Sequence, residues 1–344
     1  MARHHDDIPA IATAQDVARI ANVSQSAVSR AFTPGASVAP ATRERILAAA
    51  QEIGYQPDMI ARSLMRGRSN IVGVGVGNLV NPFLSATLDL LTIKLAEVGL
   101  RLLLFPTDDA SVATVPAREV LQYRLDALVL LATALSPELA QHCARARVPV
   151  VLYNRQAPEG AAESSVSGDN DMGGRSVAAF LCAGQHRRFA FMPGIDASLA
   201  SRQRGAAFAA YLAEQGRDAP IVEPGMFTHE GASAAMRRLL LRAERPDAIF
   251  CANDLMAIAA IDVARAEFGL TVGRDVSVVG FDDIAMARWP SFALTTYGQS
   301  TARLVEETVA TIQAVRAGSP PIRKTLPGAL VIRASARTPD NLAL

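Results

Sequence analysis

The stretch DVARIANVSQSAVSR, residues 16–30, holds two short segments separated by Asn-Val-Ser. Thr13 precedes the first segment and Ser24 the second, and both residue types cap helix N-termini. The apolar residues of each segment fall on one helical face: Val17, Ala18 and Ala21, then Ala27, Val28 and Ala31. This pattern predicts two short helices joined by a tight turn.

Two positions in this stretch meet the steric demands of a helix-turn-helix. Ala18 is small where the two helices would nearly touch, and Asn22 stands at the turn, where the backbone must be left-handed. Val23 adds an apolar residue directly after the turn. We therefore predict a helix-turn-helix, and an ordinary amphipathic helical hairpin is the alternative.

In a helix-turn-helix the second helix enters the major groove with its N-terminus first. We expect Gln25, Ser26 and Arg30 to contact base edges, since Gln pairs with adenine and Arg with guanine. The residues expected to bind phosphates, which fix position but not sequence, are Thr13, Ser24 and Ser29. Residues 13–69 contain seven arginines against four acidic residues, a modest basic excess that agrees with DNA as partner.

A third helix is predicted in VAPATRERILAAAQEIGY, residues 38–55. Gly54 stands at its C-terminal end. The residues expected to face inward are Ile46, Leu47, Ala50 and Ile53. The following QPDMIARSLMRGRSN is predicted to be a linker with a short helix at its centre.

From Ile71 onward the sequence has the pattern of an α/β protein. Short apolar runs that end in Gly, Pro, Asn or Asp alternate with stretches of helical length: NIVGVGV, RLLLFP, ALVLLA, VPVVLYN, RFAFMPG, DAIFCAND and VSVVGFDD. Such runs indicate buried parallel strands, and the pattern divides into halves at about residue 170. Asn154, Asn253 and Asp282 end strands, where the functional side chains of such sheets gather.

Composition limits the other classes of function. The 344 residues are 50% apolar and 19% charged with a net charge of +1, so two or three domains with a large core are expected. The three cysteines are far apart and the histidines lack metal or triad spacing, so we expect neither disulfide, metal nor cofactor. GVGVG, residues 73–77, lies within an apolar strand and lacks the spacing of a dinucleotide-binding loop. We find no signal peptide or membrane span, and expect a cytoplasmic protein that is not an enzyme.

TAQDVARIANVSQSAVSRAF and VAPATRERILAAAQEIGYQPDMIARSL together resemble the N-terminus of the LacI/GalR family of repressors. The resemblance implies that residues 57–69 form a hinge helix that orders on operator DNA, with Leu64 wedged into the minor groove beside Ala61 and Arg62. A buried linker residue is the alternative for Leu64. Asp58 stands where the family usually has Asn.

The resemblance continues through NPFLSATLDLL, GDNDMGGRSVAAFLCAGQHRRFAFMPG, RPDAIFCANDLMAIAAI and LPGALVIRAS. It implies an effector core similar to periplasmic sugar-binding proteins, with two α/β subdomains and a ligand between them. The expected organisation is a tail (1–12), a helix-turn-helix domain (13–56), a hinge (57–69), an N-subdomain (70–168 with 298–327) and a C-subdomain (169–297 with 328–340).

The resemblance also implies a set of effector-binding positions. These are Phe83, Leu84, Asn154, Asp169, Ser198, Ser201, Arg204, Phe227, Asn253, Asp282 and Gln299. Asn154 replaces the Asp common in the family, so the site is expected to be less negative. Structural alternatives are helix capping for Asn253 and Asp282, core packing for the two phenylalanines, a brace at the crossover for Asp169 and a surface ion pair for Arg204.

We therefore expect a transcriptional repressor that binds a pseudo-palindromic operator in double-stranded DNA as a homodimer. Its effector is expected to be a sugar or sugar derivative. A sugar acid, sugar phosphate or purine-type effector is the nearest alternative, and a solute-binding protein or sugar-processing enzyme a remote one. Because no heptad segment follows the core, we expect a dimer rather than a tetramer assembled through a tail.

Overall fold

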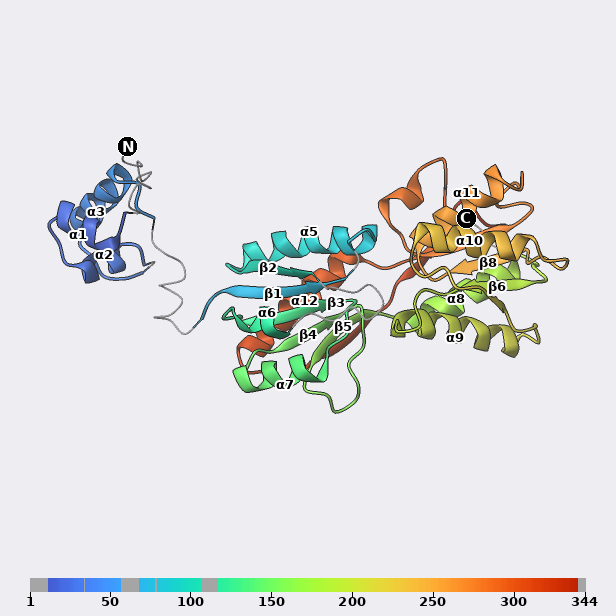
Figure 1. The fold of residues 1–344 in the computed structure, drawn as a ribbon, viewed down its shortest axis with the longest axis horizontal. Helices are drawn as coiled ribbons and strands as arrows, with labels where there is room; N and C mark the ends of the chain where they lie inside the picture. The colour runs from blue at the N-terminus through green and yellow to red at the C-terminus, as the bar shows by residue number, and fades with distance from the viewer. Residues whose placement is uncertain (1–11, 34, 57–67, 78, 107–116, 340–344) are drawn as a thin grey trace, which may run out of the picture. The chain divides into compact units, whose positions relative to one another are not determined.

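The computed structural model describes residues 12–33, 35–56, 68–77, 79–106 and 117–339 (Figure 1). The chain forms two compact units, Met1–Ser69 and Asn70–Leu344. The hinge residues Ala61, Arg62 and Leu64 lie outside the described residues.

The first unit is a helix-turn-helix with a third helix. Its elements are α1 (Ala14–Ile20), α2 (Gln25–Ala31) and α3 (Pro40–Glu52). Thr13 begins α1 in a capping box, in which its hydroxyl accepts from the backbone N–H of Asp16 and the Asp16 carboxylate accepts from that of Thr13. Asn22 has a φ of 49°, so the predicted left-handed turn is confirmed.

The core of this unit differs from the sequence prediction at one residue. Ile46 and Ala50 are buried and Ile53 is half-buried, but Leu47 is 42% exposed, so its inward assignment is wrong. Leu47 is one residue, or about 100°, around the helix from Ile46, and Ala49 occupies the inward position instead. Arg43 braces the unit, because its guanidinium donates to the carbonyl oxygens of Ala31 and Ala36.

The second unit contains two six-stranded sheets. The first has the order β11-β5-β4-β3-β1-β2 and is parallel throughout. Its strands are β1 (Ile71–Val76), β2 (Arg101–Pro106), β3 (Ala127–Leu131), β4 (Val150–Tyr153), β5 (Ser164–Gly168) and β11 (Arg323–Leu326). Val129 packs into one hydrophobic cluster and Leu128 and Leu130 into another, so both faces are buried, as a parallel sheet requires.

The second sheet has the order β12-β10-β9-β8-β6-β7, and only β12 is antiparallel. Its strands are β6 (Phe189–Met192), β7 (Ile221–Val222), β8 (Ala248–Cys251), β9 (Ser277–Asp282), β10 (Thr295–Gly298) and β12 (Ala329–Val331). The seven predicted apolar runs are all strands. The prediction from apolar runs missed β5, β7, β10, β11 and β12, because these are short or carry polar residues.

Helices cover both sheets (Figure 1). Those beside the first sheet are α5 (Pro82–Glu97), α6 (Ala117–Leu121), α7 (Pro137–Ala146) and α12 (Thr301–Arg316). Those beside the second are α8 (Asn170–Ala183), α9 (Leu199–Glu214), α10 (His229–Leu240), α11 (Asp254–Ala266) and the short η1 (Ala285–Arg288). Within the described segments, every helix is too short or too polar to pass through a lipid bilayer.

The chain passes between the two sheets three times, after β5, after β10 and between β11 and β12. At the first passage, a Cβ on Gly168 would lie 1.9 Å from the side-chain oxygen of Gln299, next to the second passage. Nearby, Gly174 lets α8 approach α9, since a Cβ there would lie 2.4 Å from the backbone oxygen of Arg204. The first contact thus packs two passages of the chain together, and the second packs two helices beside the second sheet.

Candidate functional site

The second helix of the first unit presents the predicted base-reading residues to solvent. Gln25, Ser26 and Arg30 are all exposed on α2. Ser24 begins this helix: its Oγ accepts from the backbone N–H of Ala27 and lies 2.9 Å from Oγ of Ser26. Gln25 and Arg30 are thus exposed to solvent, as contacts to base edges would require.

The three residues predicted to bind phosphate also have structural roles or contacts within the first unit. The hydroxyls of Thr13 and Ser24 form the caps of α1 and α2. Ser29 is half-buried, and its backbone oxygen accepts from Thr33. A cap hydroxyl at a helix N-terminus also lies beside free backbone N–H groups, which are themselves phosphate ligands.

A cavity of about 360 Å³ lies in the second unit, at the carboxyl ends of strands from both sheets. Segments after β1, β3 and β4 supply one wall, and segments after β6, β8 and β9 supply the other. Most of the lining is apolar: Phe83, Leu84, Leu131, Ile195, Leu199, Met226 and Phe227. A mostly apolar cleft with a few convergent polar groups is the usual form of a small-molecule site.

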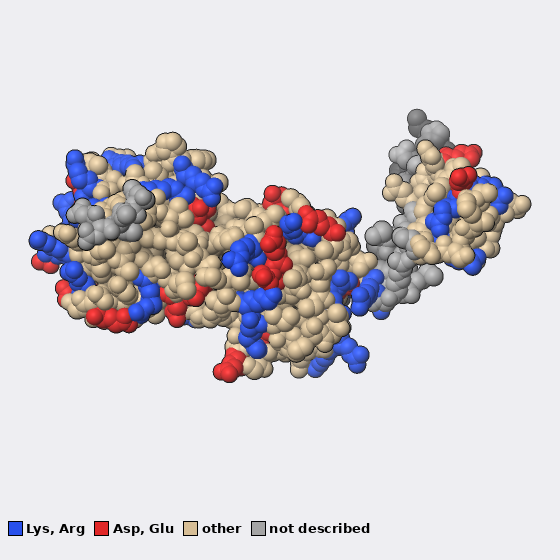
Figure 2. Space-filling view, turned by 180° about the vertical axis from the view of Figure 1, so that it is seen from behind, with Lys and Arg blue, Asp and Glu red and all other residues tan. Residues whose placement is uncertain are grey.

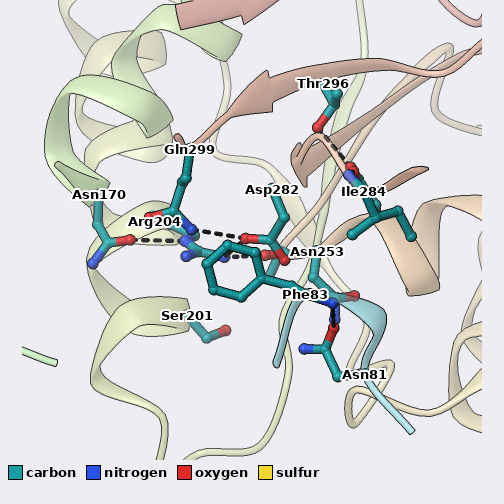
Figure 3. Close-up of polar contacts among 12 residues, drawn as sticks. Asn81, Phe83, Asn170, Ser201, Arg204, Asn253, Asp282, Ile284, Thr296 and Gln299 are labelled. Carbon is teal, nitrogen blue, oxygen red and sulfur yellow. Dashed lines mark hydrogen bonds and ion pairs between the residues drawn. The ribbon is translucent and has the colours of Figure 1, made fainter. Parts of the chain in front are cut away.

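Arg204 is the centre of the polar part of the cavity (Figure 3). It is only 3% exposed; its Nε donates to Oδ1 of Asn170 at 2.8 Å and its Nη1 to the backbone oxygen of Ala252 at 2.6 Å. Asp282 lies 3.8 Å away as counter-ion and accepts from Nε2 of Gln299 at 2.8 Å. The guanidinium also lies 3.5 Å from the ring centre of Phe281, so its position is fixed on several sides.

Three residues that line the cavity have buried polar atoms without a hydrogen-bond partner in the described part of the chain. These atoms are Oδ1 of Asn154, Nη2 of Arg204 and Nδ2 of Asn253. Together they offer one acceptor and two donors. Buried polar groups are normally paired, and an unpaired one costs about 1–3 kcal/mol. A ligand that both donates and accepts hydrogen bonds would satisfy all three.

The carboxyl groups beside Arg204 titrate abnormally. Burial raises the pKa of Asp282 from 3.8 to about 6, and Arg204 and Gln299 offset only part of that effect. Burial and the charge of Asp282 also raise the pKa of Asp254 well above its usual value. Asp254 does not line the cavity: it accepts from Thr296 at 2.6 Å and from the N–H of Ile284 at 2.9 Å, and holds the strand ends together.

We expect the wild-type protein to lose stability relative to Asp282→Asn as the pH rises. The unfolded chain releases the Asp282 proton near its ordinary pKa of 3.8, whereas the folded chain holds it to about pH 6. Protonated Asp282 therefore contributes its full share to the free energy of unfolding below about pH 4, and this share is lost as the pH rises through 6. The free energy of unfolding should fall by on the order of 2 kcal/mol between pH 4.5 and pH 8. Urea unfolding of both proteins across this range measures the effect, and a difference independent of pH would contradict it.

The cavity brings together eight of the residues predicted from the sequence. They are Phe83, Leu84, Asn154, Ser198, Arg204, Phe227, Asn253 and Asp282. Asn253 both lines the cavity and caps α11, since its Oδ1 accepts from the N–H of Met256. Asp282 does not cap a helix, and Arg204 is buried rather than part of a surface ion pair.

Three predicted residues lie outside the lining of the cavity. Asp169 caps α8 by accepting from the N–H of Met172, so it braces the passage between the sheets. Ser201 accepts from the N–H of Gly194, and Gln299 supports Asp282. Ser201 thus contacts the segment after β6, and Gln299 contacts a residue that lines the cavity.

The sequence prediction missed several residues that shape the site. Asn81, Arg155 and Thr228 line the cavity, and Asn170 and Phe281 hold Arg204. The Asn81-Pro82 pair is a helix-start signal, and Asn81 does cap α5 by accepting from the N–H of Phe83. Arg155 directly follows Asn154 at a strand end, which was a usable signal. No local signal marks Asn170 or Phe281, because their role depends on packing across elements.

Charged side chains of the second unit are mixed on the face seen in Figure 2, where basic and acidic residues intermingle. No patch of a single sign dominates that face. This face therefore lacks the basic patch that is typical of a DNA interface.

Comparison with known proteins places both units in one family. Residues 13–58 match the family described as bacterial regulatory proteins, lacI family, and residues 177–336 match the periplasmic binding protein-like domain. The HTH-type transcriptional regulator CelR of Thermobifida fusca is 33% identical over 299 residues, covering 84% of this chain and 87% of CelR.

Two solved structures are similar over nearly the whole chain. A lac repressor dimer bound to operator and the anti-inducer ONPF has a TM-score of 0.84 and 25% identity, covering 95% of this chain and 100% of that one. A complex of the transcriptional regulator CelR with cellobiose has a TM-score of 0.69 and 31% identity, covering 94% of this chain and 100% of that one. With a helix-turn-helix before a two-sheet core and a relative of this identity and coverage, the chain belongs to the LacI/GalR family of DNA-binding transcriptional regulators, which are not enzymes.

Proposed function

We propose that the protein is a repressor that binds a pseudo-palindromic operator as a homodimer and is switched by a small molecule in the cavity. The exposed Gln25 and Arg30 on α2 support the DNA part of the proposal. The similar lac repressor structure is a dimer bound to operator, which supports the assembly. The two α2 helices of a dimer would read two half-sites related by its symmetry.

The effector is a sugar or a sugar derivative in this proposal. The observation that carries it is the set of unpaired polar atoms of Asn154, Arg204 and Asn253, which lie in an otherwise apolar cavity together with the Asp282 carboxyl. Vicinal hydroxyls donate and accept at once, and the C–H faces of a sugar ring suit the rings of Phe83 and Phe227. The related CelR structure contains cellobiose. A sugar acid, a sugar phosphate or a purine-type ligand in the same cavity is the alternative.

A chain of hydrogen bonds links the cavity to the contact between the two halves of the core. Arg204 donates to Asn170, Asn170 donates to Gln203 at 2.9 Å, and Gln203 donates to Gln156 at 2.9 Å. Gln156 follows β4 of the first sheet, whereas the other three lie on helices of the second. The two halves of the core can have two relative arrangements in this proposal. A ligand that binds Arg204 more tightly in one arrangement than in the other would raise the population of the first. Through the residues that follow the hinge, this shift would change operator affinity.

Replacing Arg30 by alanine is expected to weaken operator binding by about 1–3 kcal/mol, or roughly 5- to 150-fold, because a bidentate contact to a base is lost. An electrophoretic mobility shift with palindromic candidate sites measures this. Arg145→Ala removes the same charge from an exposed position of α7 and should leave binding unchanged. We expect Leu64→Ala to act in the same direction as Arg30→Ala. If both of these variants bind the operator like the wild type, the proposed mechanism fails.

A thermal-shift screen of the full chain against sugars, polyols, sugar acids and nucleobases tests the effector class. A true effector must also change operator binding in the mobility shift. Stabilisation by nucleobases alone would replace the sugar proposal with the purine-type alternative.

A further inference from the structure

Arg155 is a cation of the cavity wall without a counter-ion among the described residues. Three residues with ionisable side chains line the cavity in its described part: Arg155, Arg204 and Asp282. Arg204 has Asp282 as its partner at 3.8 Å. Arg155 forms no ion pair or hydrogen bond with a described residue, and its neighbour Asn154 carries a neutral amide.

The surroundings of Arg155 disfavour its positive charge. Its side chain is half-buried, and burial together with the nearby charge of Arg202 lowers its pKa. Arg202 is also without an ion-pair partner among the described residues, and its guanidinium donates to the backbone oxygen of Asp196. An oxyanion beside Arg155 would supply the counter-charge that this half-buried guanidinium lacks among the described residues.

The two arginines come from opposite halves of the core. Arg155 follows β4 of the first sheet, and Arg202 lies on α9 beside the second. An anion bound by both guanidinium groups would be held by one side chain from each half. An anion would therefore couple binding to the arrangement of the halves, which is the requirement for a switch.

We propose that the effector carries an oxyanion, a carboxylate or a phosphate, and that Arg155 binds it from the half that holds the first sheet, whereas Arg204 and Asp282 belong to the other half. This inference rests on the proposed function, because it assigns a charge to the effector of the same cavity. Arginine suits the role, since its planar guanidinium binds carboxylate and phosphate through two parallel hydrogen bonds. The proposal thus selects, over a neutral sugar, two of the alternatives named for this cavity: a sugar acid or a sugar phosphate, which carries both hydroxyls and an anion.

Matched neutral and charged compounds test the proposal by isothermal titration calorimetry on the full chain. The probes are D-glucose, D-glucuronate and D-glucose 6-phosphate, with D-galactose and D-galacturonate as a second pair. We expect at least one charged member to bind about tenfold or more tightly than its neutral counterpart. A preference for glucuronate or galacturonate identifies a carboxylate, and a preference for glucose 6-phosphate identifies a phosphate. Because Arg155 is only half-buried, the ratio should fall in high salt.

Variants assign the preference to Arg155. Arg155→Gln should bring the charged-to-neutral ratio close to one, Arg155→Lys should keep part of it, and Arg187→Gln, at an exposed position away from the cavity, should keep all of it. The proposal is overturned if no charged probe binds the wild type, if neutral and charged probes bind equally, or if Arg155→Gln leaves the ratio unchanged. The proposed function fails separately, when Arg30→Ala and Leu64→Ala leave operator binding intact.

Discussion

Arg204→Met is expected to lower the free energy of unfolding by about 3–5 kcal/mol at pH 8 and to abolish the response of the protein to its effector. The variant removes the cation from a site where Asp282 is only 4% exposed, and it also leaves Asn170 and the oxygen of Ala252 without their donor. Breaking a buried pair costs far more than the pair itself contributes, because a buried charge remains uncompensated.

The loss of free energy of unfolding in Arg204→Met should be smaller at pH 5 than at pH 8. The pKa of Asp282 is already raised to about 6 in the wild type, so at pH 5 the carboxyl is mostly protonated and needs no counter-ion. Urea unfolding at the two pH values measures the difference. An equal loss at both would show that the destabilisation comes from packing alone.

Arg175→Met provides a matched control. Arg175 also pairs with a carboxylate, Glu214, and also lies over an aromatic ring, that of Tyr211, but its side chain is 43% exposed. Exposed ion pairs contribute about 0–1 kcal/mol, so this variant should be nearly as stable as the wild type. The double variant Arg204→Met/Asp282→Leu should recover much of the lost stability, because no uncompensated charge remains in the core. It should not recover the effector response, because the two side chains that would bind the effector are absent.

Phe281→Ala is expected to cost about 3–5 kcal/mol and also to weaken effector binding. The ring is fully buried; its centre lies 5.0 Å from that of Tyr297 and 6.4 Å from that of Phe250, and Arg204 rests on its face. Gly173 fits against the ring so closely that a Cβ there would lie 2.4 Å from a ring carbon. The truncation therefore opens a cavity in the core and removes the surface that orients the guanidinium.

Leucine variants separate the two effects of Phe281. Phe281→Leu and Phe250→Leu remove similar aromatic surface from the same core and should cost similar stability, about 1–2 kcal/mol each. Only Phe281 contacts the guanidinium, so calorimetry should show weaker effector binding for Phe281→Leu than for Phe250→Leu. If the two variants bind equally well, Phe281 is a packing residue only.

The sequence was most informative where local rules apply. The turn at Asn22, the caps Thr13 and Ser24 and the seven apolar strands follow from steric limits and hydrophobic periodicity within a few residues. Three of the eight cavity residues, Asn154, Asn253 and Asp282, follow from their places at strand ends, whereas the other five were implied by the family resemblance. The sequence pattern did not predict the strand β5. Its sequence SSVSG is mostly polar and small, which is typical of a loop, although all five residues are buried.

By itself, then, the sequence determined the helix-turn-helix, the alternation of strands and helices, and the residue types available at the strand ends. Only the tertiary structure decided how those residues are paired. It buried Arg204 between Asn170, Asp282 and Phe281, and it turned Asp169 away to cap a helix. Within the part of the chain that the structure describes, it also left Arg155 without a counter-ion. The physical reason is that charge pairing and desolvation depend on distances between groups far apart in the sequence, which local periodicity does not specify.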